Sequence, residues 1–167
     1  MSASPSPRPA HWDHPPARRR PAAPAPLPRG GVDPIDSAEV ALALLRAVRQ
    51  LPPAAETIAF LLDDARRGQG AIVVVSDTRA PDDVVDVVEM VGRAAADRVA
   101  SGAVSGLVVA SCRPVDGLLD GDTGRWCLLS DLAEWHGLTL VEWFVLGIDG
   151  PCCPRERCGE PPRWHTW

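Results

Sequence analysis

The residues best suited to bind a metal ion gather near the C-terminus. Within fourteen residues stand Cys152, Cys153, Cys158 and His165. Thiolate and imidazole groups are the ligands that zinc prefers in structural sites. Adjacent cysteines, however, rarely bind one tetrahedral ion together, and the segment has no C-x-x-C pair. The sequence therefore favours free thiols in a segment packed by Trp164 and Trp167, with a zinc site as the alternative.

Cys112 stands apart from this group. A nucleophilic cysteine needs a neighbouring base or cation that lowers its pKa, and no histidine lies near Cys112 in the sequence. We therefore predict a buried structural thiol. The chain has five cysteines, an odd number without regular spacing, so we expect reduced thiols rather than a disulfide framework.

The composition indicates one domain of ordinary size. The chain has 167 residues, of which 46% are hydrophobic, enough for a core. No apolar run approaches the roughly 18 to 20 residues of a membrane span, and the N-terminus lacks the apolar segment of a signal peptide. We expect a cytoplasmic protein with no membrane partner. Lysine is absent while Ala, Val, Gly and Pro are abundant, as is typical of GC-rich genomes such as those of actinobacteria.

The charge is unevenly distributed along the chain. Residues 1–35 contain five arginines and two acidic residues, whereas the remainder contains 12 arginines and 20 acidic residues. Affinity for nucleic acid comes mainly from basic side chains that neutralise phosphates. The acidic body is therefore a poor nucleic-acid partner. Only the N-terminal segment, with Arg18, Arg19 and Arg20, has the charge for such a contact, and a solvated tail is the better interpretation of it.

Proline content and apolar periodicity divide the chain into three parts. Of the 18 prolines, 10 lie at or before Pro34, which predicts a disordered, Pro/Arg-rich tail over residues 1–35. Residues 36–148 are predicted to form one α/β (α+β) domain. Its expected elements are a helix over 37–51, a hairpin over 56–76, a helix over 81–100, a strand over 106–111, a helix over 125–136 and a strand over 138–147. Residues 149–167 are predicted to be an irregular tail containing Cys and Trp.

Three tryptophans lie in or beside the last predicted helix and strand: Trp126, Trp135 and Trp143. Their spacing favours packing in the core or at its edge. Because tryptophan is enriched at the energetic centres of interfaces, a binding patch is the alternative.

The order of elements resembles that of the JAB (JAMM/MPN) domain, and in particular of its RadC-like branch, over residues 56–147. The local sequences that carry the resemblance are ETIAFLLDDARRGQGAIVVV, PDDVVDVVEMVGRAA, the buried strand before the Asp- and Gly-rich loop, and LVEWFVLG. The resemblance implies a mixed sheet with flanking helices.

Active members of that family, as the resemblance implies, bind zinc through His-x-His-Pro and a downstream Asp. An upstream Glu acts as general base, and a Ser supports the transition state of amide or isopeptide hydrolysis. Here Glu56 occupies the upstream position, Pro114 matches the family proline, and Asp122 is in register with the downstream Asp. Ser111 and Arg113 stand where the two histidines belong.

Neither Ser111 nor Arg113 can replace an imidazole ligand. A guanidinium never deprotonates and repels a cation. We therefore expect a degenerate site with no metal and no other cofactor, in which Glu56 is vestigial. Arg113 is expected to form a salt bridge with Glu56 or with Asp122, in place of the ion.

The leading functional hypothesis is a catalytically inactive JAB/RadC-like domain that acts as a protein-interaction or scaffolding module in a bacterial cytoplasm. One alternative is a zinc-dependent metallopeptidase or isopeptidase with non-standard ligands, such as Asp122, Asp116 or the C-terminal cysteines. Another is a role associated with DNA repair, which rests on analogy of fold and on the Arg-rich tail.

Overall fold

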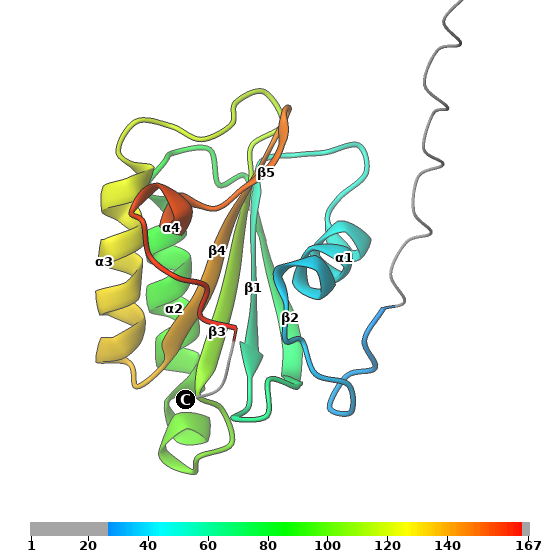
Figure 1. Cartoon of the computed structure of the whole chain (residues 1–167), viewed down its shortest axis with the longest axis vertical. Coiled ribbons are helices and arrows are strands. Elements are labelled where there is room, and N and C mark those ends of the chain that lie inside the picture. Colours follow the sequence, from blue (N-terminus) through cyan, green and yellow to red (C-terminus); the bar gives the residue numbers. More distant parts are fainter. Residues whose placement is uncertain (1–26, 165–167) are drawn as a thin grey trace, which may run out of the picture.

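Five strands form one mixed sheet in the part of the chain described by this computed structural model, residues 27–164. The order of strands across the sheet is β2-β1-β3-β4-β5 (Figure 1). Their bounds are β1 Glu56–Leu62, β2 Gly68–Ser76, β3 Gly106–Cys112, β4 Thr139–Gly147 and β5 Gly150–Cys152. β1 pairs antiparallel with both β2 and β3, β3 pairs parallel with β4, and β5 pairs antiparallel with β4. The predicted mixed α/β class is confirmed.

Four helices accompany the sheet within residues 27–164: α1 Ala38–Val48, α2 Asp83–Ala100, α3 Asp122–Trp135 and α4 Pro154–Arg157. Figure 1 shows α2 and α3 together on one side of the sheet and α1 on the other. α1 begins where the Ser37 hydroxyl accepts a hydrogen bond from the Val40 amide, at 3.4 Å. None of these helices combines the length and the apolar character needed to cross a membrane.

Alternation along the strands divides the core into two clusters. In β1, Ile58, Phe60 and Leu62 pack toward α1, whereas Ala59 and Leu61 pack toward α2 and α3. We call these two sides the α1 face and the α2/α3 face. Because both faces are covered, β1 and β3 are buried along their whole length, and their sequences are apolar nearly throughout.

The N-terminal boundary of the packed unit lies before residue 36. Pro34 forms a bridge with Arg67, and Ile35 is buried in the cluster on the α1 face. The disordered tail predicted for residues 1–35 is therefore wrong for this last part. Residues 1–26, including the three consecutive arginines, lie outside the described residues.

The C-terminal segment is more ordered than predicted. Residues 149–164 contain β5 and α4, and Trp164 is buried against Phe144, with the ring centroids 6.3 Å apart. The segment covers the part of β4 that β5 leaves unpaired, where Arg163 Nη1 donates to the Leu140 carbonyl at 3.2 Å. An open strand edge and an apolar surface beside it thus explain why this tail packs.

The three tryptophans singled out in the sequence, Trp126, Trp135 and Trp143, differ in burial. Trp126 and Trp143 are completely buried in the cluster on the α2/α3 face, which confirms core packing for both. The prediction is wrong for Trp135, whose residue surface is 85% exposed. Trp135 ends α3, and its side chain lies outside the apolar stripe of that helix, which is formed by Trp126, Leu129 and Ala133.

Candidate functional site

Arg113 and Asp122 form a two-pronged ion pair just beyond the end of β3. Arg113 Nη1 lies 2.6 Å from Asp122 Oδ2, and Nη2 lies 3.2 Å from Oδ1. The Asp122 side chain is fully buried and that of Arg113 is 11% exposed. Such fork-shaped pairing combines two charge-assisted hydrogen bonds with a fixed geometry. The predicted pairing of Arg113 with Asp122 is confirmed.

Local structure holds Asp122 in place at the start of α3. Gly121, with φ of 90°, turns the chain into the helix. Asp122 Oδ2 then accepts the Leu119 amide at 2.7 Å, and Oδ1 lies 3.2 Å from Arg125 Nη1. With these contacts α3 begins at Asp122, three residues before the start predicted from the sequence at residue 125. The buried carboxylate therefore has two guanidinium partners and a backbone donor, as a buried charge requires.

Ser111 and Trp143 extend the pair along the α2/α3 face. The Trp143 indole Nε1 donates to the Ser111 hydroxyl at 3.0 Å. The Arg113 guanidinium carbon lies 5.8 Å from the centroid of the Trp143 ring, a cation–π distance. We call Ser111, Arg113, Asp122 and Trp143 the Arg113 cluster. Sequence reasoning placed Trp143 in the core but missed its part in this cluster.

Glu56 lies on the other face of the sheet. It pairs across the strands with Cys112 and shares the α1 face with Ile58, whereas Thr57 pairs with Ser111. Glu56 Oε1 accepts the Gln50 amide at 2.8 Å, and Oε2 is buried with no hydrogen-bond partner among residues 27–164. Of the two carboxylates predicted as alternatives, Arg113 therefore pairs with Asp122 and not with Glu56. The two-residue period of a strand sends neighbouring side chains to opposite faces.

The zinc ion implied by the family resemblance does not fit the Arg113 cluster. The two Asp122 oxygens that would bind the metal are held by guanidinium groups. The Ser111 hydroxyl is occupied by the Trp143 indole. A divalent cation would have to displace Arg113 and lie beside its charge, with no imidazole to compensate.

A cavity of about 380 Å³ opens beside this cluster at the end of the sheet. Its lining comes from Ala54 and Ala55 before β1, from Asp77, Thr78 and Arg79 after β2, and from Arg113, Pro114, Val115, Asp116 and Leu119 after β3. Pro114, which the resemblance to the JAB family would align with that family's proline, thus lines the cavity. The loop after β3 packs tightly on the end of β4, since a Cβ at Gly147 would lie 2.6 Å from the Asp116 carbonyl oxygen.

Two cysteines, the buried Cys112 and the partly buried Cys153, are poorly suited to nucleophilic chemistry. Cys112 is 4% exposed, which confirms the predicted buried thiol, and burial together with the Glu56 charge raises its pKa to about 12. Burial, with the nearby Glu142 charge, likewise raises the pKa of Cys153 to about 12. At neutral pH both side chains are thiols rather than thiolates.

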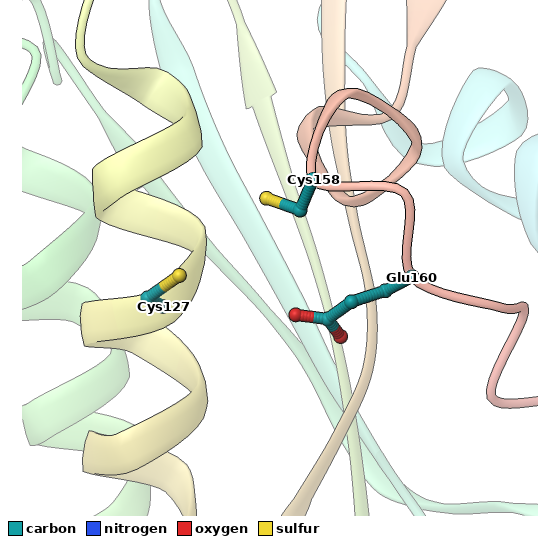
Figure 2. A group of neighbouring side chains, drawn as sticks. All are labelled: Cys127, Cys158 and Glu160. Atoms are coloured by element: carbon teal, nitrogen blue, oxygen red, sulfur yellow. The ribbon is translucent and has the colours of Figure 1, made fainter.

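The C-terminal cysteines do not assemble as one predicted group. Cys152 is exposed on β5, and Cys153 packs against the cluster on the α1 face. Cys158 lies instead beside Cys127 and Glu160, and Figure 2 shows these three side chains between α3 and the segment after α4. His165 lies outside the described residues. No sequence spacing could have indicated Cys127, because its contact with Cys158 depends on the packing of α4 against α3.

Comparison with protein-family models and with curated proteins found no match to this chain. The likeness to the JAB family therefore depends on the order of elements and on the local sequences given above. The chemistry of the described residues carries the functional argument.

Proposed function

We propose that this protein is a catalytically inactive JAB/RadC-like domain that serves as a protein-interaction or scaffolding module in a bacterial cytoplasm. The observation that carries the proposal is the ion pair of Arg113 with the buried Asp122, at 2.6 Å and 3.2 Å. In the family this place belongs to a zinc ion, which supplies the Lewis acid for hydrolysis. A guanidinium can offset the carboxylate charge but cannot activate water.

The order of the elements supports the family part of the proposal. A helix precedes an antiparallel hairpin, and β3 follows α2 and lies between β1 and β4. The loop after β3 carries Arg113 and Pro114, and the next helix begins with Asp122. These are the positions that the resemblance assigns to the site loop and to the downstream Asp.

The surface around the cavity supports the interaction part. Val115 is 80% exposed at its rim. Ile148 is 72% exposed and lies on a neighbouring turn. Its backbone amide donates to the Asp116 carbonyl at 3.4 Å. Exposed apolar side chains beside a concavity are typical of binding surfaces. A partner that covers them would contact the loop held by Arg113.

The test combines partner identification with a matched pair of variants. Proteins recovered with the full chain from a bacterial lysate are purified and titrated against it by calorimetry. We expect a defined stoichiometry, and a loss of at least about tenfold in affinity for Val115→Asp, because a charge would be desolvated in the interface. Val32→Asp is the control: Val32 is 56% exposed near the start of β2, at the opposite end of the sheet from the cavity.

Two results would count against the proposal. One is equal binding by Val115→Asp and the native chain, which would remove the cavity rim from the interface. The other is zinc-dependent cleavage of peptide or isopeptide bonds that disappears in Asp122→Asn, which would restore the metallopeptidase alternative.

A further inference from the structure

We propose that Cys127, Cys158 and Glu160 form a binding site for one thiolate-preferring divalent cation, with Zn²⁺ as its representative. The ion would lie between α3 and the segment that follows α4. This site shares no residue with the Arg113 cluster, and the proposal goes beyond the interaction function.

The geometry of the three side chains is close to that of a metal site. One ligand atom from each residue, the two sulfurs and a carboxylate oxygen, lies within 4.8 Å of the others. In Figure 2 these atoms point into the same space. Ligand atoms around a tetrahedral zinc ion with Zn–S bonds of about 2.3 Å stand roughly 3.5 to 4 Å apart. Small side-chain rotations therefore suffice to close the site.

Glu160 is held in position by residues behind it. The Trp126 indole Nε1 donates to Oε1 at 3.0 Å, and Arg163 Nη2 lies 2.5 Å from Oε2. The Arg163 guanidinium also lies over the Trp126 ring, 4.8 Å from its centroid. Carboxylates that bind metals are commonly oriented by such outer hydrogen bonds, and each oxygen keeps a lone pair for the ion.

The charges balance when a divalent cation is added. Two thiolates and one carboxylate carry three negative charges, of which the ion neutralises two. Arg163, 2.5 Å from Glu160, supplies the remaining positive charge. The assembly would therefore be neutral overall at a partly buried location, which lowers the cost of desolvating the ligands.

Ligand type selects the kind of ion. Thiolates favour zinc and other soft or borderline cations over magnesium and calcium, which take oxygen ligands. Cys127 is exposed, so a fourth coordination position can be filled by water. The bound ion would join the C-terminal segment to α3.

Cobalt(II) is the probe for the first experiment, because tetrahedral cobalt with thiolate ligands absorbs in both the near ultraviolet and the visible. The full chain is reduced, stripped of metal with a chelator and titrated with Co²⁺. We expect thiolate-to-cobalt bands that saturate at one equivalent and disappear when Zn²⁺ is added. Cys127→Ser and Cys158→Ser should each abolish the bands, and Glu160→Gln should weaken binding by about tenfold or more.

Cys152→Ser is the matched control, because Cys152 is exposed and is not one of the three proposed ligands. It should leave the titration unchanged. A second measurement needs no variant: Zn²⁺ should protect Cys127 and Cys158 from alkylation in the native chain, while Cys152 continues to react.

Three outcomes would overturn the proposal: no thiolate band under reducing conditions, bands that survive Cys158→Ser, or equal alkylation of Cys127 with and without Zn²⁺. Metal that is lost in Asp122→Asn but retained in Cys158→Ser would instead contradict the proposed function. The two failures are therefore distinguishable.

Discussion

The Arg113 side chain meets Asp122 through two hydrogen bonds, at 2.6 Å and 3.2 Å, where the Asp122 side chain has no exposure to solvent. A buried carboxylate must keep its partners, because the free energy of leaving a charge unpaired in the interior is large. Arg125 lies 3.2 Å from the same carboxylate and offsets part of its charge. The pair therefore links the loop after β3 to the start of α3.

Removal of Arg113 is predicted to destabilise the protein. We expect Arg113→Ala to lower the free energy of unfolding by about 2 to 4 kcal/mol, somewhat less than for an isolated buried pair because Arg125 remains. Urea unfolding of Arg113→Ala, Asp122→Asn and the double variant should give non-additive losses, since the two side chains are in contact. Arg79→Ala is the control, because its ion pair with Asp77 is about 80% exposed on both sides and should contribute little. Additive losses would mean that Arg113 and Asp122 act independently.

Glu142 is predicted to make stability depend on pH. Burial raises the pKa of this carboxyl, although Arg155 Nε, 2.8 Å from Oε2, opposes the shift. The folded state therefore holds the Glu142 proton to higher pH than the unfolded state does. The stability that the folded protein gains by binding this proton is fully present below the unfolded pKa of about 4.3. It is lost as the pH rises through the folded pKa. The free energy of unfolding of Glu142→Gln, measured across the same pH range, should not show this loss of stability. An identical pH dependence in the variant would exclude Glu142 as its source.

Trp164 is predicted to be a core residue although it lies near the C-terminus. It is 5% exposed and packs on Phe144 in the cluster on the α1 face. Trp164→Ala should lower the free energy of unfolding by about 3 to 5 kcal/mol, because it leaves a cavity. Trp135→Ala is the matched control: the residue is 85% exposed, so its loss should change stability by only about 0.5 kcal/mol. Similar effects from both variants would mean that the C-terminal segment does not stabilise the fold.

Four of the five thiols are predicted to fall into two groups that differ in reactivity. At pH 8, in the absence of metal, Cys127 and Cys152 should be alkylated first, because both are exposed. Cys112 and Cys153 should react far more slowly, since burial raises the pKa of each to about 12, and Cys112 is in addition closed to solvent. A time course by peptide mass spectrometry separates the two groups. Rapid modification of Cys112 in the folded protein would contradict its buried position.

Much of the fold could be predicted from local patterns. The β-branched runs and turn residues predicted the hairpin of β1 and β2, and the apolar spacing from Val84 to Ala95 predicted the buried side of α2. The lack of a nitrogen ligand at Ser111 and Arg113 was equally visible, because ligand chemistry depends on residue type. So was Arg113 as a partner for Asp122, nine residues away.

Only the tertiary structure decided which distant side chains share a space. Strand alternation placed Glu56 on the α1 face, although its neighbour Thr57 pairs with Ser111 across β1 and β3. The packing of α4 on α3 brought Cys158 to Cys127, and the unpaired edge of β4 holds the segment up to Trp164. The physical reason is common to all three. A local pattern reports which side of an element is apolar, whereas contacts between elements depend on the register, facing and edges of the assembled sheet.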